Sequence, residues 1–259
     1  MSNRQGEFIW YELMTTDITA ARAFYGAVVG WTISESSDMP GMDYRMVSAP
    51  DGTVAGMMPL DADMIAGGAR SMWVGYIAVD DVDETAARIA ATGGHVFVPP
   101  RDIPEVGRFA MAGDPQGATF YVMRGFPDER SDAFRADAPG HCAWNELTTP
   151  DQPGAHAFYE GLLGWTSPDS MPMGELGDYR FLWAGDLRLG ATMPGDGPAH
   201  WLFYFAVPSI TRAMDAITAH GGTVTNGPHE VPGGGHIITG TDPQGARFAL
   251  FGSLEEADI

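Results

Sequence analysis

The first residues of the chain alternate between two sets of side chains, both of them largely apolar. One set is Phe8, Trp10 and Glu12, and the other is Ile9, Tyr11 and Leu13. This pattern predicts a strand at residues 7–13 that is packed on both faces. A helix is predicted next, because apolar residues recur at positions i, i+3, i+4 and i+7 after a capping Asp17 and before Gly30. Short strands at 31–34, 44–48 and 53–58 complete a β-α-β-β-β unit.

The same order of elements follows in residues 72–123. An apolar strand at 72–80 leads into acidic residues and then into a helix whose apolar stripe ends at Gly93-Gly94. Strands are predicted at 95–98, 108–112 and 118–123, and residues 60–72 are predicted to be a loose connector. Residues 1–125 therefore contain two β-α-β-β-β units.

The landmarks of the first half recur in the second half, and those of the opening block do so at a constant offset. The opening Gly6 to Asp17 has a counterpart at Gly140 to Asp151, an offset of 140 − 6 = 134 residues. Further repeated blocks follow: Phe24-Tyr25 and Phe158-Tyr159, Gly30-Trp31 and Gly164-Trp165, Trp73 and Trp201, and Asp114-Pro-Gln-Gly117 and Asp242-Pro-Gln-Gly245. A period this long indicates a duplicated domain. We predict a first domain at 1–125, a linker at 126–139 and a second domain at 140–259.

Composition excludes several classes of function. A net charge of −20 disfavours nucleic-acid or anionic-membrane surfaces. All fourteen basic residues are arginine, which excludes lysine Schiff-base chemistry and the phosphate-binding lysine of a P-loop. The single cysteine, Cys142, excludes an intrachain disulfide. The chain has no apolar run of membrane-spanning length and no secretory signal, so a cytoplasmic location is expected.

Four β-α-β-β-β units in two pairs, together with the Phe-Tyr-x-x-x-x-Gly-Trp and Asp-Pro-x-Gly blocks, resemble the vicinal oxygen chelate superfamily. This superfamily contains glyoxalases, bleomycin-resistance proteins, fosfomycin-inactivating transferases and extradiol dioxygenases. The resemblance implies an α+β fold with two tandem glyoxalase-like domains. Each domain would be a pair of β-α-β-β-β units that form a curled half-barrel sheet, or cup, with the helices outside.

Metal-dependent members of the superfamily carry His or Glu ligands at inward strand positions of the cup. In the first half the corresponding positions are Trp10, Met58, Tyr76 and Tyr121. In the second half they are Trp144, Met193, Tyr204 and Ala249. None of these side chains is a usual ligand of a catalytic divalent ion, so no cofactor is expected. A divalent metal held by displaced ligands is the alternative.

Aromatic side chains at these positions indicate a cup that binds a flat or hydrophobic ligand, although the same residues could simply fill the barrel. Glu12 and Glu146 each lie two residues beyond a predicted wall tryptophan, on the same strand face. A carboxylate in an apolar cup could transfer protons, whereas the simpler role for a duplicated residue is bonding to a neighbouring strand's backbone or to an arginine such as Arg108. Arg108 and His236 occupy equivalent places after a loop and are further candidates for ligand contact.

Two functions follow from these residues. The first is a glyoxalase-like lyase or isomerase with Glu12 or Glu146 as the proton-transfer residue. The second is a bleomycin-resistance-type protein that sequesters a planar or hydrophobic compound without changing it. In both cases the expected partner is a small molecule, with no nucleic acid and no membrane, and the expected state is a monomer or a homodimer.

Overall fold

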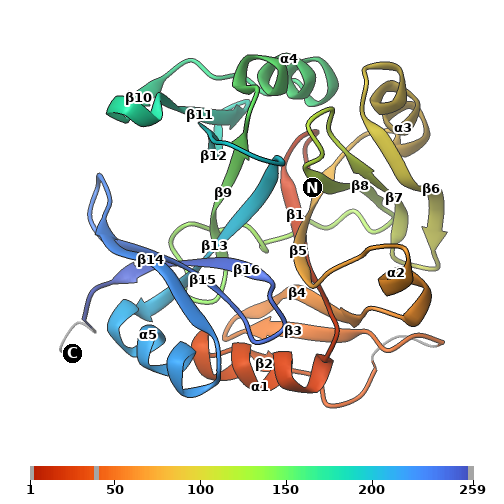
Figure 1. Cartoon of the computed structure of the whole chain (residues 1–259). Helices are drawn as coiled ribbons and strands as arrows, with labels where there is room; N and C mark the ends of the chain where they lie inside the picture. The colour runs from red at the N-terminus through yellow and green to blue at the C-terminus, as the bar shows by residue number, and fades with distance from the viewer. Residues whose placement is uncertain (1–2, 38–40, 256–259) are drawn as a thin grey trace. The chain divides into compact units, whose positions relative to one another are not determined.

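The computed structural model describes residues 3–37 and 41–255 and contains two eight-stranded mixed sheets (Figure 1). The strands of the first sheet, in spatial order, are β2 (Thr32–Ile33), β3 (Arg45–Ala49), β4 (Gly52–Pro59), β1 (Phe8–Thr15), β5 (Met72–Ala78), β8 (Thr119–Gly125), β7 (Gly107–Gly113) and β6 (His95–Ile103). The strands of the second sheet are β10 (Ser170–Pro172), β11 (Asp178–Ala184), β12 (Leu187–Pro194), β9 (Cys142–Thr149), β13 (His200–Ser209), β16 (Arg247–Ser253), β15 (His236–Thr241) and β14 (Thr223–Glu230). One sheet is thus formed by each half of the sequence, and the predicted α+β class is confirmed.

The main helices begin where the sequence predicted. They are α1 (Ile18–Val28), α3 (Val82–Ala91), α4 (Gln152–Leu163) and α5 (Ile210–Ala219). The side chain of Asp17 accepts a hydrogen bond from a backbone N–H in the first turn, as predicted, and Asp151 and Ser209 cap α4 and α5 in the same way. None of the described helices has the length and hydrophobicity required to span a bilayer.

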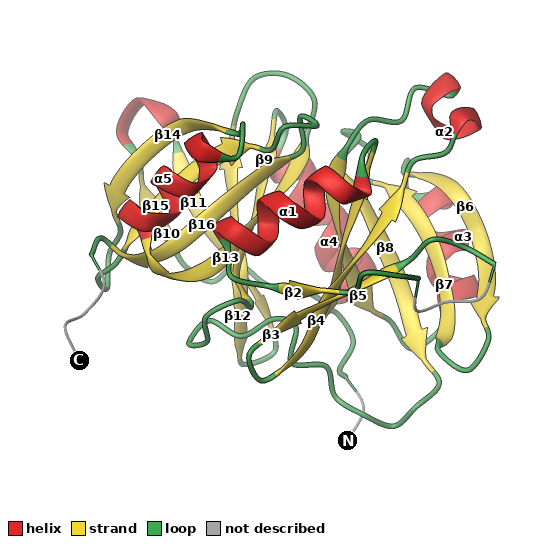
Figure 2. Cartoon of the chain, turned by 90° about the horizontal axis from the view of Figure 1, so that it is seen from below, coloured by secondary structure: helices red, strands yellow, loops and turns green. Residues whose placement is uncertain are grey.

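Two local features differ from the prediction. Within the expected loose connector, residues Ala62–Ala66 form the short helix α2, which begins because Asp61 accepts a hydrogen bond from the Met64 N–H. None of its residues is buried, and Figure 2 shows it on the connection between β4 and β5. Strand β6 continues to Ile103, beyond the predicted 95–98, because it stays paired with β7 through a register shift.

The helices and strands form two compact units, and each unit draws on both halves of the sequence. Unit 1 contains the chain up to Ile9, Val74–Ser131 and Asn145–Leu202. Unit 2 contains Trp10–Trp73, Asp132–Trp144 and the chain from Phe203 onward. In Figure 1, α1 and α5 of unit 2 lie side by side.

The core of each unit contains an equivalent aromatic cluster. In unit 2, Tyr25 donates a hydrogen bond to Asp242 Oδ2 (3.1 Å) and accepts one from Trp73 Nε1 (2.8 Å). In unit 1, Tyr159 makes the equivalent bonds with Asp114 Oδ2 (3.1 Å) and Trp201 Nε1 (3.2 Å). Burial raises the pKa of both tyrosines and of both aspartates. The repeated sequence blocks therefore meet each other in the core.

Candidate functional site

The face of β9, β11 and β12 in unit 1 carries the predicted catalytic residue Glu146. Strand β9 alternates, so Asn145 and Leu147 are fully buried on the opposite face. Glu146 pairs with Ala191 of β12, and Ala191 pairs with Phe181 of β11. Because residues opposite each other in a sheet point to the same side, Glu146 and Phe181 lie on one face.

Glu146 is hydrogen-bonded to a tyrosine of this face. The Tyr179 hydroxyl donates to Glu146 Oε2 at 2.7 Å, and only 8% of Glu146 is exposed. The ring of Tyr179 packs edge-on against Phe181, with 5.8 Å between centroids. A nearly buried carboxylate held by a phenol has the chemistry of a proton-transfer pair, because both groups exchange protons and the hydrogen bond fixes their orientation.

The same face contains a stacked cation. Arg188 of β12 places its guanidinium carbon 5.2 Å from the ring centroid of Phe181 and 5.7 Å from that of Trp183. These are distances at which the positive charge is attracted to the aromatic faces. The indole Nε1 of Trp183 donates to Asp169 Oδ1 at 2.9 Å, which holds that ring in place.

In the first half, the equivalent face belongs to unit 2, and different side chains cover it. Trp10 Nε1 donates to the Tyr44 hydroxyl at 2.9 Å. The Tyr44 ring lies directly over Gly56, the β4 partner of Glu12, so that a Cβ on Gly56 would come 2.0 Å from the hydroxyl oxygen. Glu12 is 2% exposed. Trp10 and Tyr44 thus cover the strand that lies beside Glu12.

The other predicted wall residues are packed by their neighbours. Tyr76 and Tyr121 are stacked, with 4.1 Å between centroids and 14° between ring planes, and each is 5% exposed. Tyr204 is 4% exposed and pairs with Ala249. Trp144 and Met58 are half-buried, on β9 and β4 respectively.

Arg108 lies outside the sheet that carries Glu146, and His236 belongs to unit 2. Arg108 of β7 is bound by two carboxylates, with Nε–Oδ2 of 2.6 Å to Asp83 and Nη1–Oδ1 of 2.7 Å to Asp102. The hydrogen bond from Arg108 holds the pKa of Asp83 below its usual value. His236 begins β15 in unit 2, opposite Glu230 and Gly252.

The residues at the expected metal positions do not fit a metal centre. None of the eight side chains predicted for those positions is His, Asp or Glu. Within residues 3–37 and 41–255, no group of three or more His, Cys, Asp and Glu side chains could hold a metal ion.

A repeat in the sequence identifies Tyr179, the tyrosine that binds Glu146, although the predicted pattern of helices and strands does not. Asp178-Tyr179-Arg180 repeats Asp43-Tyr44-Arg45 at an offset of 178 − 43 = 135 residues. This offset is one residue larger than that of the opening block, so a search at a fixed spacing misses it. The repeat places an equivalent tyrosine beside the strand of each glutamate.

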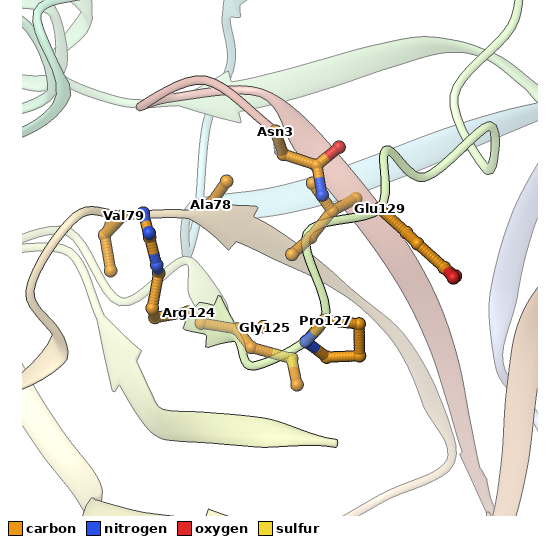
Figure 3. A pocket seen from close by; sticks show the side chains of 9 residues that line it. Asn3, Ala78, Val79, Arg124, Gly125, Pro127 and Glu129 are labelled. Carbon is orange, nitrogen blue, oxygen red and sulfur yellow. The ribbon is translucent and has the colours of Figure 1, made fainter. Parts of the chain in front are cut away.

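A small pocket lies elsewhere in unit 1. It has a volume of about 30 Å³ and is lined by Asn3, Ile9, Ala78, Val79, Met123, Arg124, Gly125, Pro127 and Glu129 (Figure 3). This volume suits a water molecule or two and is too small for an organic ligand. None of the predicted site residues lines it.

Comparisons with known proteins agree on one family over both halves of the sequence. The model of the "Glyoxalase/Bleomycin resistance protein/Dioxygenase superfamily" matches residues 8–122 and 138–250. A protein of Mycobacterium tuberculosis named "Putative glyoxylase CFP32" is 35% identical over 252 residues, which cover 95% of each chain. The anthracycline biosynthesis protein DnrV of Streptomyces peucetius is 30% identical, covering 93% of this chain and 91% of its own.

Solved structures share the fold at lower identity. Homoprotocatechuate 2,3-dioxygenase from Arthrobacter globiformis superimposes with a TM-score of 0.66 at 18% identity, covering 96% of this chain and 80% of that one. The Mn(II)-bound glyoxalase from Novosphingobium aromaticivorans gives a TM-score of 0.64 at 21% identity, covering 98% and 84%. These likenesses concern the architecture alone.

Proposed function

Because the chain belongs to the glyoxalase/bleomycin resistance protein/dioxygenase superfamily, we propose that it binds a small hydrophobic or aromatic molecule on the face of β9, β11 and β12 and transfers a proton on it. Glu146 is the proton-transfer residue, and no metal takes part. The observation that carries this proposal is the 2.7 Å hydrogen bond from the Tyr179 hydroxyl to the nearly buried Glu146 carboxylate.

The geometry supports a role in acid–base chemistry. The phenol of Tyr179 holds the carboxylate in one orientation, so that little reorganisation is needed when a substrate binds. A substrate whose acidic C–H or O–H lies within hydrogen-bond reach of Glu146 would lose its proton to the carboxylate, and Tyr179 would then donate to the negative oxygen that develops. Proton abstraction next to a carbonyl is the reaction class that uses both groups.

The surrounding side chains support an aromatic or hydrophobic substrate. Arg188 holds its planar guanidinium over the rings of Phe181 and Trp183, and a planar molecule can stack on this group. Two relatives at 30% identity are named as anthracycline biosynthesis proteins, which makes polycyclic aromatic ketones and quinones the first compounds to test.

The second candidate function is sequestration of an aromatic compound without turnover. The same hydrogen bond favours sequestration, because the Glu146 carboxylate that accepts from Tyr179 can have a purely structural role. In that case the aromatic face alone would be used, and Glu146 would order Tyr179 for packing.

The two functions are separated by measuring proton exchange and binding together. The protein is mixed with a panel of aromatic ketones and hydroxyquinones in deuterated buffer, with exchange of acidic C–H protons followed by NMR and affinity by calorimetry. Glu146→Gln keeps the shape of the side chain and should abolish exchange while affinity changes less than threefold. Tyr179→Phe should slow exchange by roughly 10²–10³-fold if the phenol stabilises negative charge.

Glu12→Gln is the matched control from the first half and should leave exchange intact. If Glu12→Gln abolishes exchange instead, the active face is that of the first half. Binding without exchange in the wild type supports sequestration, and no binding across the panel contradicts both functions. Near-stoichiometric divalent metal in the purified protein would contradict the metal-free mechanism.

A further inference from the structure

The two halves of the chain differ at the positions that surround the Glu146–Tyr179 pair. The Asp-Tyr-Arg repeat and the Met58-Pro59 and Met193-Pro194 pairs share one offset of 135 residues (193 − 58 = 135). The same offset aligns Phe181 with Met46, Trp183 with Ser48, and Arg188 with Thr53.

The structure supports this alignment. Trp183 is the strand partner of Arg188, as Ser48 is the partner of Thr53. In the first half the two partners are short polar side chains, with 3.4 Å between Ser48 Oγ and Thr53 Oγ1. In the second half the same two places hold an indole and a guanidinium. The duplicated hairpin thus presents a hydroxyl pair in one copy and a cation on an aromatic surface in the other.

The charge of Arg188 is held over the rings by its neighbours in the sheet. Its guanidinium lies over both Phe181 and Trp183. The Arg188 side chain is exposed to solvent, so a ligand that stacks on the aromatic face can reach it.

The chain as a whole repels anions, because its net charge is −20. An anionic ligand would therefore need a positive group at its binding place, and a planar guanidinium suits an oxyanion because it donates two parallel hydrogen bonds.

We propose that Arg188 recognises an anionic group on the aromatic ligand, so that the ligand is an aromatic carboxylate or an enolate- or phenolate-bearing compound. The group that loses a proton would lie at Glu146 and the anionic group at Arg188. This inference rests on the proposed function and adds the charge of the ligand to it.

The test compares two probes of the same shape, anthraquinone-2-carboxylate and anthraquinone-2-carboxamide, by calorimetry at pH 7.5. Wild type is expected to bind the carboxylate at least tenfold more tightly than the carboxamide. Arg188→Gln should bring this ratio to about one without changing carboxamide affinity, and Arg188→Lys should retain a preference because the charge remains. Thr53→Gln is the control at the aligned position of the first half and should leave the ratio unchanged.

The outcomes separate the two proposals. If wild type binds both probes equally, recognition of an anion is refuted while the aromatic site stands. If wild type binds neither probe nor any compound of the aromatic panel, the proposed function fails as well. A preference that survives in Arg188→Gln assigns anion recognition to another residue and refutes the role of Arg188. Circular dichroism melting curves of each variant show whether the fold is retained, and the charge-preserving Arg188→Lys keeps the test decisive if Arg188→Gln is unstable.

Discussion

The hydroxyl of Tyr25 joins three parts of unit 2 that lie far apart in the sequence. It donates to Asp242 Oδ2 at 3.1 Å and accepts from Trp73 Nε1 at 2.8 Å, and Tyr25 is fully buried. The other oxygen of Asp242 accepts from the backbone N–H groups of Gln244 and Ala246 at 2.9 and 2.8 Å. One carboxylate therefore ties a helix of the first half to a turn of the second half, and Tyr25→Phe tests what this connection contributes.

The expected loss can be worked out from the bonds removed. The ring of Phe keeps the packing against Phe24 and Phe248, so the change is confined to the hydroxyl. A hydrogen bond to a charged group contributes about 1.5–3 kcal/mol, and a buried donor left without an acceptor, here the Trp73 indole N–H, costs about 1–3 kcal/mol. These terms overlap, so we expect a loss of about 3 kcal/mol in the free energy of unfolding. For a chain of this size the melting temperature falls by roughly 6–12 °C.

The loss should also depend on pH. Burial raises the pKa of Asp242, whereas the hydrogen bond from Tyr25 lowers it. Because the bond favours the charged carboxylate, it stabilises the folded state fully above the pKa of Asp242 and less as pH falls through it. The difference between wild type and Tyr25→Phe should therefore be larger at pH 7 than at pH 4.5.

Urea denaturation followed by far-ultraviolet circular dichroism at both pH values measures these quantities. Tyr159→Phe is the matched variant in unit 1, where Tyr159 bonds to Asp114 and Trp201, and it should behave in the same way. A loss below about 1 kcal/mol in both variants, with unchanged slopes, would refute the idea that the repeated tyrosine and aspartate blocks stabilise the units by bonding to each other.

Three further predictions follow from local geometry. Burial, with a smaller contribution from the charge of Arg180, lowers the pKa of His156 to about 4. The free energy of unfolding should therefore fall as pH falls from 6.5 towards 4, by at most about 3 kcal/mol, and by less because the ring is partly exposed. Urea denaturation of His156→Gln should show a smaller loss of stability over that pH range. Gly56→Ala places a Cβ 2.0 Å from the Tyr44 hydroxyl oxygen and should cost about 1–3 kcal/mol by displacing that ring, and a melting temperature equal to that of wild type would contradict the packing described. Residues 1–125 expressed alone should dimerise or fail to fold, as read by light scattering and circular dichroism, because Phe248 and helix α5 of the second half supply part of the packing around α1; a stable monomer would contradict this.

Much of the fold could be predicted because its signals are local. A capping side chain such as Asp17 acts on a backbone N–H three residues away, and the spacing of apolar residues reports directly on which helix face is buried. The order of the elements and the duplication followed from such signals. Helix α2 was missed because all its residues are exposed, and an exposed helix leaves no apolar stripe in the sequence.

The partners of the repeated blocks could not be predicted in this way. Tyr25 and both Asp-Pro-Gln-Gly turns are visible in the sequence, but nothing local indicates that Tyr25 bonds to Asp242 and not to Asp114 of its own half. Likewise Glu146 was a candidate from its strand position, whereas its partner Tyr179 lies 33 residues away and two strands later. Such choices depend on how whole elements pack, and that packing is a property of the complete chain.

The two halves share the residues that stabilise the core and differ in residues that are exposed on a sheet face. The buried tyrosine, aspartate and tryptophan bonds occur in both units, because the loss of any one member would leave a buried polar group without its partner. The outer residues of the β11–β12 hairpin carry no such constraint, since substituting a side chain exposed on a sheet face leaves the backbone pairing intact. These residues are the ones that differ, with Phe181, Trp183 and Arg188 in place of Met46, Ser48 and Thr53. A protein in which only the second half binds the ligand needs a duplicated framework with an aromatic, positively charged face in that half alone. This difference between the halves is the reason that we propose Glu146, and not Glu12, as the proton-transfer residue.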